Sequence, residues 1–178
     1  MNTKKTLQEL KGLTRWQRII QYVIKRSLPG GGYFKSLYLK AFGLPPSTSI
    51  SLGLFITHPN VTCGKNCHLG NTEFRAMGKI TLGDNVSISY NNFITTTSHD
   101  FLDWNKIIVK PITIGDNVWI TTNCTILQGV TIGSNTVIGA GSVVTHDIPS
   151  GVLAAGNPCK IIKKIDFSIE NKKIILQS

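Results

Sequence analysis

A repeat of six residues constrains the fold more than any other feature of this sequence. From Ile114 onward, six consecutive segments each begin with Ile or Val: IGDNVW, ITTNCT, ILQGVT, IGSNTV, IGAGSV and VTHDIP. The same frame occurs upstream from Leu82, in LGDNVS, ISYNNF and ITTTSH. It is interrupted twice, by an irregular step within residues 69–75 and by an insertion between His99 and Lys110.

A period of six fits neither an α-helix, whose apolar positions recur three and four residues apart, nor a hairpin strand that alternates every two residues. Six residues can instead form one short strand and one corner, so that three segments close a triangular coil. Stacked coils bury the β-branched first positions and pair their backbone groups with the coils above and below. The pattern therefore predicts a parallel β-helix. A β-sandwich of many short strands is disfavoured because it would not keep this frame.

The charge distribution limits the partners of the chain. The 178 residues carry a formal net charge of +10, but residues 1–45 contain nine Lys or Arg and one acid, whereas residues 46–178 are nearly balanced. No nucleic-acid recognition motif accompanies the basic segment, so we expect no nucleic-acid binding. We find neither an apolar run of the ~20 residues that span a bilayer nor a secretory signal. The four cysteines form no CxxC pair, and we expect a cytoplasmic location.

The basic amino-terminal segment, residues 1–45, is predicted to be helical. Residues 4–28 show an amphipathic pattern, and a second aromatic and basic segment, 33–42, precedes the coils. The apolar positions of the first pattern are Leu7, Leu10, Leu13, Trp16, Ile20, Val23 and Ile24. Two interpretations stay open. The helix caps the open edge of the first coil, or it lies in the headgroup layer at the inner face of a membrane, near a lipid-linked glycan precursor.

Five blocks within residues 80–163 resemble the left-handed β-helix acyltransferase superfamily, and within it the galactoside, maltose and surface-polysaccharide O-acetyltransferases. The blocks are TTTSHD (95–100), PITIGDNVWI (111–120), GVTIG (129–133), IGAGSVVTHDIP (138–149) and AAGNPCK (154–160). The resemblance implies an all-β fold, a left-handed parallel β-helix of hexapeptide repeats with an N-terminal helical segment.

Together with the repeat, the resemblance divides the chain into three parts. They are the helical segment 1–45, an acyltransferase domain 46–164 with an extruded loop at 100–110, and a C-terminal tail 165–178. The resemblance also implies a homotrimer with active sites between neighbouring subunits, acetyl-coenzyme A as the acyl donor, and no metal.

The resemblance places the catalytic base at His99. Histidine suits this role because its pKa lies near neutrality, so that it can take the proton of an attacking hydroxyl. The alternative for His99 is a structural role at the turn where the chain leaves the coil. The spacing of the four histidines in the sequence does not favour a zinc site of the carbonic anhydrase type.

Seven positions match the coenzyme site of the family. They are Trp119, Thr122, Ala140, Thr145, His146, Lys160 and Lys163. The resemblance assigns the first three to the pantetheine arm and the last four to the nucleotide end. Relatives carry Lys in place of His146 and Arg in place of the two lysines, and Lys lacks the bidentate fork of Arg. We therefore expect weaker anion contacts at the nucleotide end.

The acceptor side is matched less closely. Asn71 is the nearest equivalent of a polar side chain that relatives place at the irregular early step. The loop after His99 contains Asp100 and Trp104, and loops of this kind cover the acceptor in relatives. An aromatic face beside polar groups suits a sugar, which offers both C–H faces and hydroxyls.

We therefore predict transfer of an acetyl group to a sugar hydroxyl, in the biosynthesis of a surface or capsular polysaccharide. Two alternatives remain. The acceptor is an amino-sugar nucleotide, serine or an antibiotic, or the chain is a β-helix scaffold without catalytic activity.

Overall fold

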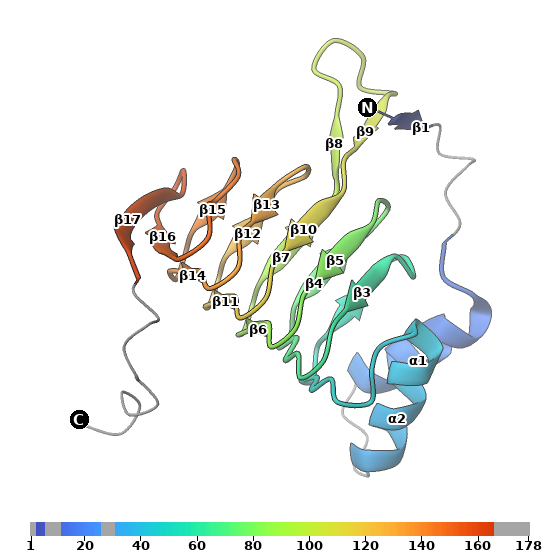
Figure 1. Ribbon diagram of the computed structural model, residues 1–178. Coiled ribbons are helices and arrows are strands. Elements are labelled where there is room, and N and C mark those ends of the chain that lie inside the picture. Colours follow the sequence, from blue (N-terminus) through green and yellow to red (C-terminus); the bar gives the residue numbers. More distant parts are fainter. Residues whose placement is uncertain (1–2, 6–11, 26–30, 166–178) are drawn as a thin grey trace, which may run out of the picture.

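Three parallel sheets close the body of the protein into a triangular prism (Figure 1). The computed structural model describes residues 3–5, 12–25 and 31–165. The first face consists of β3 (Val61–Cys63), β5 (Ile80–Leu82), β10 (Ile112–Ile114) and β13 (Thr131–Ile132). The second face consists of β6 (Ser87–Ile88), β11 (Trp119–Ile120), β14 (Val137–Ile138) and β16 (Val152–Ala155). The third face consists of β2 (Phe55–Ile56), β4 (Glu73–Arg75), β7 (Phe93–Thr95), β12 (Thr125–Ile126) and β15 (Val143–Val144).

The repeat sets the register between coils. Equivalent first positions pair laterally, as Ile114 does with Ile132 on the first face and Ile120 with Ile138 on the second. All six first positions from Ile114 to Val144 are at most 1% exposed. Burial of this β-branched column, together with backbone pairing between coils, stabilises the prism. The predicted parallel β-helix is confirmed.

Stacked asparagines shape the first corner, which joins the first face to the second. The asparagines are Asn66, Asn85, Asn117 and Asn135, and each has φ near +57°. Asparagine tolerates this left-handed conformation better than most residues. Their side-chain amides are also hydrogen-bonded from coil to coil, for example Asn117 Nδ2 to Asn135 Oδ1 at 3.0 Å. We call the corner between the second and third faces the second corner, and the corner between the third and first faces the third corner.

An antiparallel hairpin leaves the prism at the third corner (Figure 1). Its strands are β8 (Thr97–His99) and β9 (Ile107–Val109), and β1 (Thr3–Lys5) pairs with the outer edge of β9. The predicted loop at 100–110 is therefore wrong in its bounds. The excursion begins at Thr97, and only residues 100–106 connect the two strands.

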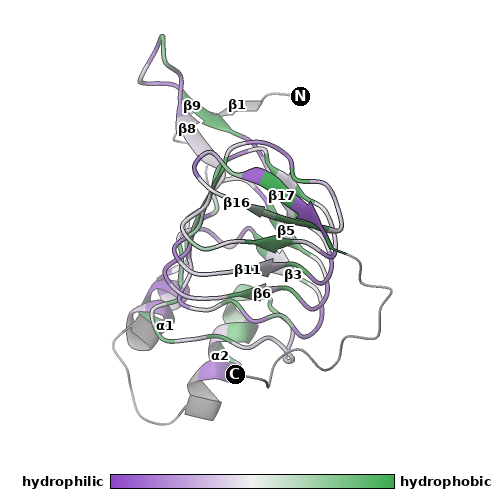
Figure 2. Cartoon of the chain, turned by 90° about the vertical axis from the view of Figure 1, so that its left-hand side faces the viewer, coloured by the Kyte–Doolittle hydropathy of each residue, from purple (hydrophilic) through white to green (hydrophobic). Residues whose placement is uncertain are grey.

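Two helices lie against the first coil, at one end of the prism (Figures 1 and 2). They are α1 (Arg15–Lys25) and α2 (Gly31–Phe42). A capping box begins α1, because Gln17 N donates to Thr14 Oγ1 at 3.2 Å and Thr14 N donates to Gln17 Oε1 at 2.9 Å. The predicted helix over 4–28 is wrong at its start, since Lys4 and Lys5 belong to β1. Residues 6–11 and 26–30 lie outside the described part.

Helix α1 also caps the β-helix. The backbone N–H of Ile56 lies in β2, the edge strand of the third face, and donates to Gln21 Oε1 at 3.1 Å. An unpaired edge group is thereby satisfied inside the protein. The structure thus agrees with the cap interpretation in that α1 covers the edge of the first coil, but the contact is made by Gln21, and Trp16 of the predicted apolar stripe is exposed.

The opposite end of the prism carries β17 (Lys160–Lys164), which pairs antiparallel with β16. All five residues of β17 are exposed. The predicted tail 165–178 is described only at Ile165, whose N–H donates to the carbonyl of Gly151 at 2.7 Å.

Candidate functional site

The hairpin holds His99 away from the prism, with its ring exposed. Nδ1 of His99 lies 2.8 Å from the carbonyl oxygen of Trp104. A carbonyl can only accept a hydrogen bond, so Nδ1 carries the proton in the neutral ring and Nε2 is the basic nitrogen. This is the tautomer that a general base requires when it presents Nε2 to a substrate.

Local contacts in the connecting loop position the Trp104 carbonyl. The loop is closed by Asp100 N, which donates to the carbonyl of Lys106 at 2.9 Å. Asp100 Oδ1 accepts from Leu102 N at 3.0 Å, and Lys106 Nζ lies 2.7 Å from Asp103 Oδ2. The ion pair holds the pKa of the Asp103 carboxyl below its usual range. Asp100 therefore shapes the loop.

The tip of the hairpin is apolar and points into solvent. Phe101, Leu102 and Trp104 are 92%, 97% and 82% exposed. Trp104 thus faces outward with its indole while its carbonyl holds His99. The sequence could suggest only the indole, because a backbone carbonyl has no signature in the sequence.

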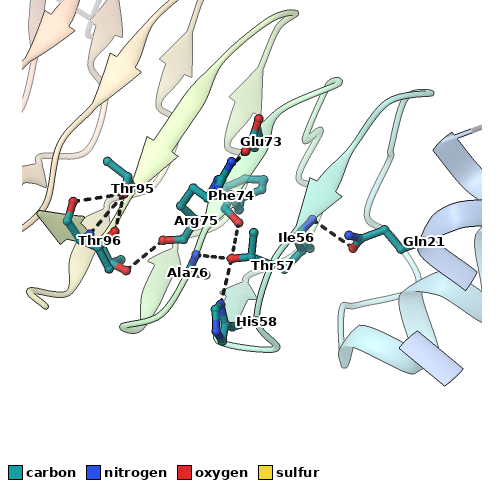
Figure 3. A network of polar contacts seen from close by, with 11 residues as sticks. Gln21, Ile56, Thr57, His58, Glu73, Phe74, Arg75, Ala76, Thr95 and Thr96 are labelled. Atoms are coloured by element: carbon teal, nitrogen blue, oxygen red, sulfur yellow. Dashed lines mark hydrogen bonds and ion pairs between the residues drawn. The ribbon is translucent and has the colours of Figure 1, made fainter. Parts of the chain in front are cut away.

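A polar network supports the foot of the hairpin from below (Figure 3). Thr96 N and Oγ1 both donate to the carbonyl of Arg75, at 3.1 and 3.0 Å. One coil further down, Ala76 N donates to Thr57 Oγ1 at 3.2 Å. Thr57 follows Ile56, which bonds to Gln21 of α1. Hydrogen bonds along the third corner therefore connect the helical cap with the start of the hairpin.

Three of the predicted coenzyme residues lie on or beside the second corner. Trp119, on β11, is half exposed, and its Nε1 donates to Ser89 Oγ at 3.2 Å. Thr122 and Ala140 occupy successive coils of the corner itself, where Gly141 N donates to the carbonyl of Thr122 at 3.0 Å. Ser89 orients the indole, and no sequence signal identified it.

The other four coenzyme residues separate into two pairs. Thr145 and His146 lie at the third corner, where Thr145 Oγ1 is 2.7 Å from His146 Nδ1. Lys160 and Lys163 lie on β17, at the end of the second face, and both side chains are exposed. Exposed cations at this end of the prism can reach an anionic ligand without losing an internal partner.

Asn71 lies at the second corner, within an asparagine ladder. Its Nδ2 donates to Asn91 Oδ1 at 3.2 Å, and its Oδ1 accepts from Asn91 N. It borders a hollow of about 530 Å³ whose lining is polar and aromatic: Gly53, Phe55, Asn71, Glu73, Arg75, Asn91, Asn92 and Phe93. Asn71 is therefore held in the ladder at the rim of the hollow, whose polar and aromatic lining is the kind of surface expected for a sugar.

Most of the predicted site residues thus lie at two different corners of the coil. His99, Asp100, Trp104, Thr145 and His146 belong to the third corner and its hairpin, whereas Asn71, Thr122 and Ala140 belong to the second corner. Trp119 lies on β11 of the second face, and Lys160 and Lys163 lie on β17. Taking about five residues of each six-residue repeat along one side of the coil, at about 3.3 Å per residue, these corners lie roughly 16 Å apart. Within residues 3–5, 12–25 and 31–165, no group of three or more His, Cys, Asp or Glu side chains could hold a metal ion.

Comparison with known proteins agrees with the resemblance found in the sequence. A family model described as bacterial transferase hexapeptide (six repeats) matches residues 111–146. Galactoside O-acetyltransferase of Escherichia coli (strain K12) is 42% identical over 114 residues, 58% of this chain. The match spans only 56% of the length of that relative.

Two solved structures match over most of their length. A maltose O-acetyltransferase from Clostridium difficile 630 has a TM-score of 0.78 at 34% identity, covering 85% of both chains. A galactoside acetyltransferase in complex with coenzyme A has a TM-score of 0.72 at 32% identity, covering 90% of this chain and 89% of the other. The predicted fold class, a left-handed parallel β-helix with an N-terminal helical segment, is confirmed.

Proposed function

Because the chain belongs to the bacterial transferase hexapeptide family, we propose that it is an O-acetyltransferase that moves an acetyl group from acetyl-coenzyme A to a sugar hydroxyl. The observation that carries the proposal is the contact between His99 Nδ1 and the Trp104 carbonyl, which leaves Nε2 as the basic nitrogen. The names of the relatives, galactoside and maltose O-acetyltransferase, support a sugar as acceptor. The neighbour that binds coenzyme A supports the donor.

The reaction requires one proton acceptor and no acyl-enzyme. A sugar hydroxyl has a pKa far above neutrality, so its attack on a thioester is slow until a base takes the proton. His99 Nε2 takes the proton as the hydroxyl oxygen forms a bond to the acetyl carbonyl carbon. The carbon–sulfur bond then breaks, and the same Nε2–H returns its proton to the coenzyme thiolate. The Trp104 carbonyl accepts a hydrogen bond from Nδ1–H throughout, so that Nε2 remains the nitrogen that takes and returns the proton.

The donor would lie along the second corner. The exposed indole of Trp119 and the corner backbone at Thr122 and Ala140 offer an apolar and polar track for a pantetheine arm. The cations of Lys160 and Lys163 stand at the end of the same face and suit the phosphates of the nucleotide. Thr145 and His146 would contact the nucleotide from the third corner.

A homotrimer would bring these groups together. In a cyclic trimer, the third corner of one subunit can meet the second corner of the next, which removes the roughly 16 Å between them in a single chain. The acceptor would then sit between the hairpin of one subunit and the hollow beside Asn71 of its neighbour. Asp100 would shape that cleft, and the Trp104 indole would cover the sugar.

We place the reaction in the cytoplasm and assign it to the assembly of a surface polysaccharide. The four cysteines are free thiols, which suits a reducing compartment. We divide the chain into the helical segment 1–45, the acyltransferase domain 46–164 and the tail 165–178. Contact with a membrane is a separate proposal, because it depends on α1 and not on the His99 site.

The direct test is acetyl-coenzyme A turnover, followed by release of the free thiol, against a panel of sugars and glycan precursors. We expect His99→Ala to lower kcat by about 100-fold or more, the scale of a lost general base. Equal rates in the two proteins would remove His99 from the chemistry. Coenzyme binding without turnover on any sugar would favour another acceptor, and the absence of coenzyme binding would favour the scaffold.

Subunit mixing tests the shared site. Ala140 is exposed, so Ala140→Trp fills the donor track of its own corner without disturbing the core, and we expect it to be inactive. Co-expression of Ala140→Trp with His99→Ala should restore roughly a quarter of the wild-type rate, because random assembly pairs an intact corner with an intact hairpin in that share of sites. A site contained within one chain would give no recovery.

A further inference from the structure

We propose that the outer face of α1, formed by Arg15, Trp16, Arg18, Ile19 and Tyr22, is a docking surface for an anionic lipid bilayer. The sequence alone allowed two roles for this helix, as a cap of the first coil or as a membrane contact. The structure shows that Gln17 and Gln21 make the capping contacts, whereas the five residues of this face are exposed.

The orientation of α1 departs from that of a typical surface helix. A surface helix usually turns apolar residues toward the core and polar residues toward water. In α1, Gln17 and Gln21 are buried, whereas Trp16, Ile19 and Tyr22 are 74%, 46% and 57% exposed. Only Ile20 among the described α1 residues is a buried hydrophobic.

Hydrogen bonds fix this orientation. Gln17 Nε2 donates to the carbonyl of Ala41 in α2 at 2.8 Å, and Gln21 Oε1 accepts from Ile56 N in β2. Rotating the helix to bury Trp16 would leave these buried polar groups without partners, which costs free energy. The aromatic and aliphatic side chains are therefore held outward by the cap itself.

The charge of the helical segment selects an anionic surface as the partner. Arg15 and Arg18 lie among the exposed apolar residues of α1, and neither α1 nor α2 contains an acid. On α2, Lys40 is exposed and Lys35 is half-buried. Mixed aromatic, aliphatic and arginine side chains suit the headgroup layer, where rings enter the acyl boundary and guanidinium groups stay at the phosphates. No helix in the described part of the chain is both long and apolar enough to cross a bilayer.

A hollow beside this face adds a place for a headgroup. It has a volume of about 500 Å³, and its lining includes Arg18 and Tyr22 from the docking face together with Leu13, Gln21 and Phe55. Arg18 Nε donates to the carbonyl of Leu13 at 3.2 Å, which holds the guanidinium at the edge of the hollow. A lipid phosphate can therefore meet a fixed cation next to an aromatic ring.

The position of α1 in the fold allows such contact. The two helices lie at one end of the prism, while the hairpin projects sideways from its middle (Figures 1 and 2). In the cyclic trimer of the proposed function, three copies of α1 share one height along the threefold axis and can engage one membrane together. This step rests on the proposed function, whereas binding by the single helix does not.

The test is flotation of the purified full chain with vesicles of phosphatidylcholine alone and of phosphatidylcholine with phosphatidylglycerol in a 7:3 ratio. We expect binding to the anionic vesicles only. The variant Trp16→Ser/Ile19→Ser/Tyr22→Ser should bind about 10- to 100-fold more weakly, because it removes the inserting apolar area. Arg15→Gln should weaken binding about fivefold. Leu52→Ser is the matched control, since Leu52 is 61% exposed but lies off this face.

The outcomes separate the possible occupants. Binding that falls in the triple variant and not in Leu52→Ser supports the bilayer. Equal binding by wild type and the triple variant, or no binding to either vesicle, overturns the proposal. Loss of the oligomer in the triple variant also overturns it, because the face would then be a subunit contact. Turnover on a soluble acceptor, measured on the same samples, reports separately on His99.

Discussion

In the coils between Ile112 and Ile148 every inward position of the repeat is buried, whereas in the hairpin between Thr97 and Val109 only Val109 is buried. The coils are stabilised by stacking between segments about 18 residues apart, which makes each position dependent on two neighbours. The hairpin is stabilised by short-range hydrogen bonds and one exposed ion pair. The candidate catalytic residue thus lies on a part of the molecule with little buried surface, supported by the buried coils.

The largest expected effect tests the scaffold. Ile126 is fully buried in β12, so Ile126→Ala should lower the free energy of unfolding by about 3 to 4 kcal/mol. Ile108→Ala, in the half-buried middle of β9, should cost about 1 kcal/mol. Urea unfolding at one fixed protein concentration measures both. Similar losses at the two sites would contradict the division between coils and hairpin.

The second prediction concerns the hairpin loop. Replacing residues 100–106 with Asn-Gly keeps the pairing of His99 with Ile107 in a two-residue turn but removes the Trp104 carbonyl. We expect kcat to fall about 10- to 100-fold, because the tautomer of His99 is no longer held. The control is Trp104→Ala, which retains the carbonyl and should alter the acceptor KM more than kcat. Wild-type kcat in the shortened protein would show that the carbonyl contact is dispensable.

The third prediction concerns the second corner. Trp119→Ala should raise the KM for acetyl-coenzyme A by about 10-fold, with a smaller change in kcat, because the ring contacts bound donor equally in the ground and transition states. Ser89→Ala removes only the hydrogen bond to the indole and should have a smaller effect in the same direction. Steady-state kinetics with varied donor measures both. A loss confined to kcat would place Trp119 at the chemistry and not in the donor track.

The smallest effect concerns the helical cap. Thr14→Ala removes the oxygen that accepts from Gln17 N and should destabilise α1 by about 1 kcal/mol. Hydrogen exchange of the α1 amides should accelerate, while the coil amides from Ile112 to Ile148 keep their protection. Thr14→Ser retains the cap and is the control. Equal acceleration in the coils would mean that cap and prism open as one unit.

The sequence located the coils accurately because their signal is repeated. Each turn of the prism places Ile or Val at the same inward position, so a single irregular segment does not obscure the frame. The asparagines of the first corner follow the same logic, since the fourth position of the repeat needs a positive φ. The start of the helical segment was misplaced because the apolar periodicity of residues 4–28 outweighed Thr14 and Gln17, whose spacing as a capping box marks the true start.

The face that α1 turns inward could not be read from its hydrophobic pattern. The pattern placed Trp16 on the packed side with Leu13 and Ile20, but Trp16 lies in solvent and Gln17 and Gln21 are buried. The partners that decide this are the Ala41 carbonyl and the Ile56 N–H, which are backbone groups 24 and 35 residues away in sequence. Neither has a side-chain signature that a sequence comparison could detect.

By itself the sequence determined the β-helix, its family and the identity of the candidate base, because each rests on side chains that recur at a fixed spacing or in a fixed motif. The tertiary structure decided how those residues are used. It set the tautomer of His99 through a backbone carbonyl, distributed most of the predicted site over two corners of the coil, and turned the aromatic side chains of α1 outward. The tautomer depends on a backbone carbonyl five residues away, which has no side-chain signature. The other two properties depend on the closure of the coil and on hydrogen bonds between side chains and backbone groups that are far apart in sequence.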